Sequence, residues 1–216
     1  MKNSMKLFAT AALVVIAAMS MAQGRGMMQM RGGGMALLLA RDDVGKEIKL
    51  TTDQKAKLDE QRQAMMDNMR AQFANGGGGG DREAMRKQMT DMMAKAEKEA
   101  LAVLDDGQKK RLKELWIQRS GNNVIANEDV QKDLGLTDDQ KAKVKSLMDA
   151  QATANGEIFQ KVQNGEIDRN EVRPLMEKNN KTLGEELGKV LTSDQAAKLK
   201  AMRGVEFKFD EDTGGN

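Results

Sequence analysis

The sequence lacks cysteine, histidine and tyrosine altogether, and its 216 residues include a single proline. Without Cys the chain can form no disulfide and carry no lipid on an N-terminal cysteine, so packing and helix caps must stabilise it. Without His and Cys it has no His-based catalytic triad and no Cys nucleophile, and the usual ligands of zinc and nickel are missing. We therefore expect a protein that is not an enzyme and that needs no cofactor.

The remaining candidates for chemistry are weak. Neighbouring carboxylates such as Asp42–Asp43, Asp105–Asp106 and Glu185–Glu186 diverge in direction on a helix, which favours solvated faces or helix starts. The glycine run Gly76–Gly80 lacks the Lys-Ser/Thr of a phosphate-binding loop and is predicted to act as a flexible hinge. Few aromatic residues and a nearly balanced charge, 35 Lys and Arg against 33 Asp and Glu, argue against nucleic-acid binding.

The N-terminus reads as a secretory signal peptide over residues 1–22. Lys2 and Lys6 precede the apolar stretch Leu7–Ala18, which is too short to cross a bilayer, and Ser20–Ala22 is a small-x-small cleavage site. We expect export to the periplasm, or secretion where the cell has no outer membrane, and no stable membrane insertion. Residues 23–34 are mostly Met, Gly and Arg without a period, and they are predicted to form a disordered tail.

One short pattern occurs four times: a Leu, a capping residue and, three residues later, a Gln. A Thr or Asp at the N-cap accepts a hydrogen bond from the backbone N–H of the third helical residue. A Gln at that third position returns a bond to the N–H of the cap, so each copy predicts a helix start. The copies are Leu50-Thr51-x-x-Gln54, Leu104-Asp105-x-x-Gln108, Leu136-Thr137-x-x-Gln140 and Leu191-Thr192-x-x-Gln195.

The four copies form two pairs with nearly the same spacing. Leu50 and Leu136 are 86 residues apart, Leu104 and Leu191 are 87 apart, and Phe73 returns as Phe159. This predicts an internal duplication, with a first repeat at 35–121 and a second at 122–216 that ends in a short tail. Composition and apolar spacing favour helices. One short helix is predicted at 35–48, a long helix starts at Thr51 with its apolar stripe reaching Phe73, and a third runs from Asp81 to near Leu104. Another starts at Asp105 and carries Leu112, Leu115 and Trp116, and the rest are predicted at 128–134, 137–163, 168–190 and 192–202. Pro174 should kink its helix or delay the start, and residues 205–209 should be extended with Phe207 and Phe209 packed.

These motifs resemble those of the LTxxQ-motif (Spy/CpxP-like) family of periplasmic proteins. Its members carry two such motifs on a helical hairpin chain, and two chains pair into a thin curved dimer that holds non-native proteins without ATP. The resemblance covers about residues 44–203, and Asp105 in place of Thr is the departure within the motifs. It implies an all-α fold in which tandem duplicated long helical hairpins form one thin, curved, Spy-like layer, a pseudo-dimer in one chain.

The resemblance also implies an ATP-independent chaperone-like or envelope stress-response protein, whose partners are unfolded or misfolded envelope proteins. The residues themselves point to a surface for such clients, because the first hairpin is rich in Met, a flexible side chain suited to promiscuous binding. Some of these methionines pack as core at helical, coiled-coil-like spacing. The candidates off that stripe, with the cations interleaved among them, are Met66, Met93, Arg62, Arg70, Arg86 and Lys87.

Two alternatives stay open. Thioethers suit Cu(I), so the chain is alternatively a soft-metal (copper) binding or sensing protein of the same family, with Met27, Met28, Met30 and Met35 as ligands. A third interpretation is a structural helical homo-oligomer without clients.

Overall fold

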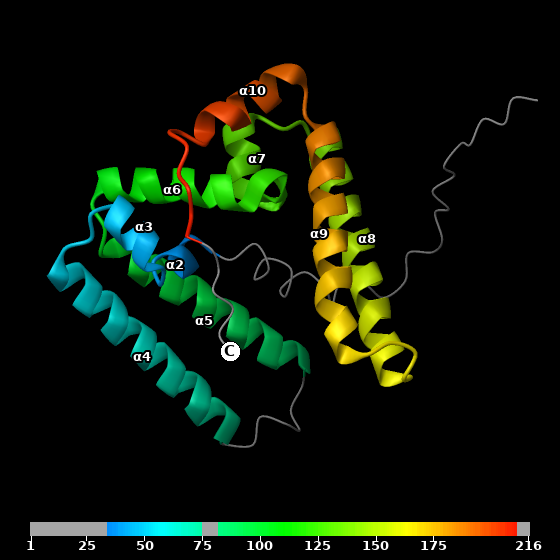
Figure 1. Cartoon of the computed structure of the whole chain (residues 1–216), viewed down its shortest axis with the longest axis horizontal. Helices are drawn as coiled ribbons and strands as arrows, with labels where there is room; N and C mark the ends of the chain where they lie inside the picture. The colour runs from blue at the N-terminus through cyan, green and yellow to red at the C-terminus, as the bar shows by residue number, and fades with distance from the viewer. Residues whose placement is uncertain (1–33, 75–81, 211–216) are drawn as a thin grey trace, which may run out of the picture.

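A computed structural model describes residues 34–74 and 82–210 of the chain (Figure 1). These residues are helical over most of their length and contain no strand, so the all-α fold class is confirmed. The predicted signal peptide, the glycine run and the methionines Met27, Met28 and Met30 lie outside the described residues. Among the described helices, none is long and apolar enough to cross a membrane.

Two long helical hairpins extend from a central group of shorter helices (Figure 1). The first hairpin consists of α4 (Thr52–Ala74) and α5 (Arg82–Ala102), and the second of α8 (Asp138–Gln163) and α9 (Arg169–Val190). The arrangement of both hairpins in one curved layer stays a prediction. The central group comprises α2 (Met35–Leu38), α3 (Asp42–Glu47), α6 (Asp106–Ser120), the 3-10 helix η1 (Gly121–Ala126), α7 (Glu128–Leu134) and α10 (Ser193–Met202).

The hydrophobic core lies in this central group and draws on both predicted repeats. Helix α6 contributes Leu112, Leu115 and Ile117, whose exposed fractions are 1% or less, and η1 contributes Ile125. From the second hairpin, Leu187 joins the same buried cluster with 0% exposure. The two predicted repeats therefore share one core, and each hairpin is anchored to it by its base.

Each of the four motifs begins a helix through a reciprocal pair of hydrogen bonds. The backbone N–H of Thr51 donates to Gln54 Oε1 at 3.0 Å, and the N–H of Gln54 donates to Thr51 Oγ1 at 3.2 Å. Asp105, Thr137 and Thr192 form the same capping box with the Gln three residues later. The leading Leu side chains pack inward: Leu104 and Leu136 are buried, and Leu50 and Leu191 lie partly buried against the core.

Two details differ from the prediction. Residues 35–48 form two short helices, α2 and α3, because the chain turns at Arg41, whose extended backbone makes it the N-cap of α3. Pro174 lies inside α9, yet that helix begins at Arg169, so the predicted delay is wrong. The start holds because the Glu171 carboxylate accepts a hydrogen bond from the Asp168 N–H at 2.8 Å.

Replacing Thr137 by Ala is expected to lower the free energy of unfolding by about 1 kcal/mol, the typical loss when an N-cap side chain is removed. The Thr137 hydroxyl accepts the Gln140 N–H at 3.3 Å at the start of the longest described helix. Urea denaturation followed by circular dichroism measures the change. Thr182→Ala, at an exposed position within α9, is the matched control. Equal midpoints for Thr137→Ala and the wild-type chain would contradict the expectation.

Candidate functional site

The two hairpins differ in how tightly their helices pack. No side chain that the structure describes on α4 or α5 is buried. Helices α8 and α9 of the second hairpin, in contrast, bury Val144, Gln151, Asn155, Ile158, Met176, Leu187 and Val190. The first hairpin therefore leaves the inner faces of its helices partly exposed to solvent.

Aligning the hairpins through their motifs shows what fills each seam, the line along which the two helices of a hairpin face one another. With Leu50 set on Leu136, Met65 and Met69 of α4 take the positions of Gln151 and Asn155 of α8. With Leu104 set on Leu191, Met92 and Met93 of α5 take the positions of Asn179 and Asn180 of α9. Four thioethers thus stand where the second hairpin has four amides.

The four amides of the second hairpin pair with one another across its seam. Gln151 Nε2 donates to Asn180 Oδ1 at 2.6 Å, and Asn179 Nδ2 donates to Asn155 Oδ1 at 3.0 Å. Gln151 and Asn155 are buried, with exposed fractions of 8% and 6%. Because buried amides are stable only when they are hydrogen-bonded, this pairing closes the second hairpin on itself. The methionines at the aligned positions of the first hairpin are partly buried and can make no equivalent bond, although Gln61 Nε2 donates to Glu99 O at 3.4 Å nearer the base.

At the base of each hairpin, the motif glutamines form an amide pair. Gln54 Nε2 donates to Gln108 Oε1 at 2.7 Å, and Gln108 Nε2 donates to Gln54 Oε1 at 2.9 Å. Gln140 and Gln195 repeat this exchange at 2.6 and 3.1 Å.

Each glutamine of these pairs also donates to the carbonyl of the residue that precedes the other motif. Gln54 donates to Val103 O at 3.0 Å, and Gln140 donates to Val190 O at 2.8 Å. In the opposite direction, Gln108 donates to Lys49 O and Gln195 donates to Gly135 O. Every side-chain amide is thereby fully used. The motif consequently ties the two ends of a hairpin together, a role that helix capping alone does not predict. The sequence does contain a sign of this second role. A capping box accepts Glu or Gln, yet all four copies have Gln, whose side-chain amide can also donate a hydrogen bond.

The candidate cations of the first hairpin are mostly paired with neighbouring acids. Arg62 lies 2.6 Å from Asp59, and Arg70 lies 3.6 Å from Asp67. Lys87 Nζ lies 2.6 Å from Asp91 Oδ2, and the Arg86 side chain is outside the described residues. Exposed ion pairs of this kind contribute little to stability, so they can exchange partners at small cost.

The candidate methionines are distributed over different environments. Met66 is 46% exposed on α4, and Met93 is half-buried on α5. Met35 begins α2 and lies partly buried against the core, and its role as a metal ligand stays a prediction. Its backbone N–H donates to Glu97 Oε1 at 2.9 Å, which holds it against α5. Among the residues that the structure describes, no group of three or more carboxylates forms a metal site.

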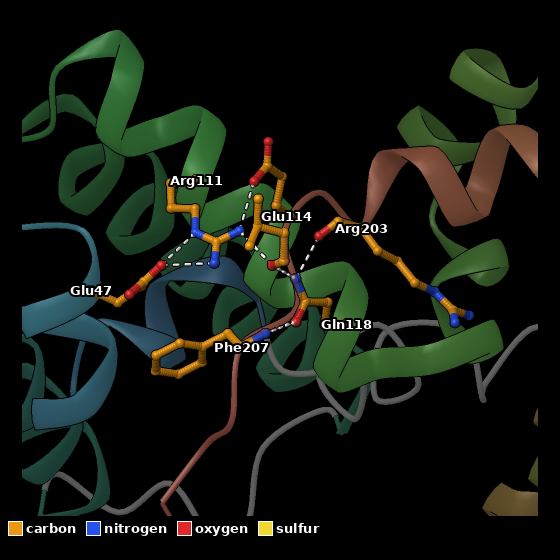
Figure 2. A network of polar contacts seen from close by, with 7 residues as sticks. Glu47, Arg111, Glu114, Gln118, Arg203 and Phe207 are labelled. Carbon is orange, nitrogen blue, oxygen red and sulfur yellow. Dashed lines mark hydrogen bonds and ion pairs between the residues drawn. The ribbon is translucent and has the colours of Figure 1, made fainter.

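A second polar site binds the C-terminal tail to the central helices (Figure 2). Arg111 of α6 donates to Glu47 at 2.8 Å, to Glu114 at 2.8 Å and to the carbonyl of Val205 at 2.9 Å. Burial acts to lower the pKa of Arg111, but its hydrogen bonds to Glu114 and Glu47 raise that pKa above the ordinary value. Gln118 of the same helix donates to the carbonyl oxygens of Arg203 and Val205 and accepts the N–H of Phe207.

The far end of the tail is held by Arg41 and Asp43. The Asp43 carboxylate accepts from the Arg41 guanidinium at 2.9 and 3.0 Å and from the Val44 and Asp210 backbone N–H groups at 2.8 Å. The hydrogen bonds from Arg41 are the main reason that the pKa of Asp43 falls to about 2, with the two backbone donors adding to the effect against the opposing influence of burial.

This lowered pKa predicts a loss of stability in acid. The folded chain holds Asp43 ionised more strongly than the unfolded chain does, so its contribution is present above pH about 4. It is lost as the pH falls towards 2. The shift corresponds to roughly 2 kcal/mol.

Asp43→Asn should therefore lower the free energy of unfolding by about that amount at pH 7, and the difference from the wild-type chain should become small near pH 2. Urea denaturation across this pH range measures it, and Asp42→Asn, at an exposed position, is the control. A difference that does not depend on pH would contradict the assignment.

Comparison of the chain with protein-family models, with curated proteins and with solved structures found no match. The resemblance to LTxxQ-motif proteins therefore rests on the four motifs and their spacing.

Proposed function

We propose that the protein is an ATP-independent chaperone-like or envelope stress-response binding protein of the periplasm, which holds non-native proteins on its first hairpin. The observation that supports this most is the contrast between the two hairpins. They share motifs, caps and the amide pair at the base, but one closes its seam with hydrogen-bonded amides and the other leaves a partly exposed seam of methionines.

A methionine seam suits clients without a fixed sequence. Its thioether side chains are unbranched and adapt to apolar surfaces of different shape. Covering partly exposed apolar surface yields about 25 cal/mol per Å², so a modest contact gives weak and reversible binding that needs no nucleotide to release it. The amide seam of the second hairpin offers no such surface, because its polar groups are already paired with one another.

The charged residues around the seam add attraction at longer range. Arg62 and Lys87 lie at exposed positions beside the methionines, paired with carboxylates of their own helices. A client carboxylate can take the place of such a partner, since an exposed ion pair is worth about 1 kcal/mol or less. We propose that these cations increase the rate of capture, and that the apolar seam provides most of the affinity.

The direct test is suppression of aggregation of a chemically denatured protein, without nucleotide, first without copper and then with Cu(I). Suppression at near-stoichiometric amounts without metal is the result that the proposal requires. Suppression that appears only with Cu(I) would favour the soft-metal alternative instead. Failure in both conditions, together with stable oligomers by light scattering, would favour a structural role.

A further inference from the structure

The tail segment Val205–Asp210 crosses the central helices as an extended chain (Figure 1). Its side chains alternate between apolar and charged, Val-Glu-Phe-Lys-Phe-Asp, which is the pattern of a half-buried β-strand. Within the part of the chain that the structure describes, the segment pairs with no strand, and side chains of α3, of α6 and of the turn before α3 hold it. The surface beneath the tail therefore already binds an extended amphipathic peptide.

The hydrogen bonds to the tail reach its backbone. Arg111 and Gln118 donate to the Val205 carbonyl at 2.9 and 2.8 Å, and Gln118 Oε1 accepts the Phe207 N–H at 2.9 Å (Figure 2). At the other end, Arg41 donates to the Asp210 carbonyl and Asp43 accepts the Asp210 N–H, both at 2.8 Å. Because every peptide has these backbone groups, the contacts recognise an extended conformation in preference to one sequence.

The side-chain contacts of the tail select aromatic groups at alternate positions. Phe207 and Phe209 lie partly buried against the core, with their rings edge to face at a centroid distance of 5.0 Å. The guanidinium groups of Arg41 and Arg119 lie 5.8 and 5.5 Å from the centre of the Phe209 ring, within the range of cation–π attraction. Val205, in contrast, is 76% exposed. A peptide that binds this surface therefore needs two apolar side chains, two residues apart, in addition to an extended backbone.

We propose that this surface, the tail groove formed by Arg41, Asp43, Arg111, Gln118 and Arg119, is a second client-binding site, which takes extended segments of non-native proteins with apolar side chains at alternate positions. The chain's own tail occupies the groove until such a segment displaces it. The inference rests on the proposed function, and it names the class of client: unfolded strands of β-sheet and β-barrel proteins, whose sequences alternate in this way.

The tail is then an internal competitor, and weakening it must raise the affinity for a peptide in trans. If the tail occupies the groove in more than about nine molecules in ten, its release raises the apparent affinity at least about tenfold. Phe207→Ala/Phe209→Ala in the full chain weakens the tail and leaves the groove residues intact. Adding Gln118→Ala to this variant removes the central backbone contact of the groove itself.

Fluorescence anisotropy with three labelled hexapeptides tests the proposal: the tail sequence, an unrelated alternating sequence, and a peptide with the tail's composition but its apolar residues in one block. Both alternating peptides should bind the double variant at least about tenfold more tightly than the wild-type chain. The block peptide should not gain, and Gln118→Ala should remove the gain. No gain in a variant with unchanged helical circular dichroism would overturn the proposal. A gain for the tail sequence alone would assign the groove to the tail of this chain or of a second copy, and would also overturn it.

A second measurement avoids any dependence on the folding of the variants. In the wild-type chain, an excess of the unrelated alternating peptide should accelerate hydrogen exchange at the amides of Phe207 and Asp210, which are hydrogen-bonded only while the tail is docked. Unchanged exchange at saturating peptide would contradict displacement. Aggregation suppression by the full chain is scored separately, so a failed groove with an active hairpin, or the reverse, identifies which proposal is wrong.

Discussion

Giving the first hairpin the amide seam of the second is expected to abolish most of the aggregation suppression. The variant replaces four methionines by the residues at the aligned positions: Met65→Gln, Met69→Asn, Met92→Asn and Met93→Asn. The new amides can pair across the seam as those of α8 and α9 do, so the helices should remain folded while the apolar surface disappears. We expect the amount of protein needed for half-maximal suppression to rise about tenfold, which corresponds to a loss of about 1.4 kcal/mol in client binding.

The matched control replaces the same four methionines by Leu. Leucine keeps the apolar character and nearly the volume of methionine but loses its flexibility, so suppression should fall by much less than with the amides. Circular dichroism and the urea midpoint verify that both variants remain folded. If the amide variant suppresses aggregation as well as the wild-type chain, the methionine seam does not hold the clients.

The helix starts of this fold are predictable from the sequence because their cause is local. A cap residue and a Gln three positions later satisfy each other's backbone groups within one helical turn, and no distant residue is needed. The same locality explains the end of α7 at Gly135, whose backbone adopts the left-handed conformation (φ = 68°) that glycine tolerates best. The extended conformation of the C-terminal tail is also predictable, since apolar and charged side chains alternate within six consecutive residues.

What the sequence did not reveal depends on contacts between segments that are far apart. The pairing of Gln54 with Gln108 joins residues 54 positions apart, and capping alone accounts for both of them. The groove residues Arg41 and Asp43 lie 169 and 167 positions from Asp210, and in the sequence they are ordinary members of a charged helix start. Their roles emerge only once the shared core brings α3, α6 and the tail together.

The difference between the methionine seam of the first hairpin and the amide seam of the second could be predicted only in part. The alignment of the repeats already sets methionines against amides, but it does not state whether the amides face one another. The hydrogen bond from Gln151 to Asn180 shows that the amides face one another across the second hairpin. Because Met65 and Met93 occupy the aligned positions, the same arrangement is inferred for them in the first hairpin. Comparing the two predicted repeats thus uses one hairpin as the reference for the other.

Gln140 of α8 and Gln195 of α10, which are partly buried at the base of the second hairpin, are expected to be strongly coupled in stability. Each of Gln140→Ala and Gln195→Ala removes hydrogen bonds and leaves the partner amide without its own, which should cost about 2 kcal/mol. The double variant should cost about 1 to 2 kcal/mol less than the sum of the two single losses, because the second change removes a group that is already unpaired.

Gln140→Glu separates the two roles of the motif. A carboxylate at this position still accepts the Thr137 N–H, but it cannot donate to Val190 O. If the tie across the hairpin matters more than the cap, Glu should cost nearly as much as Ala in urea denaturation, whereas Gln160→Ala, exposed on the same helix, should change little. Additive losses in the double variant, or a neutral Gln140→Glu, would show that the motif only starts helices.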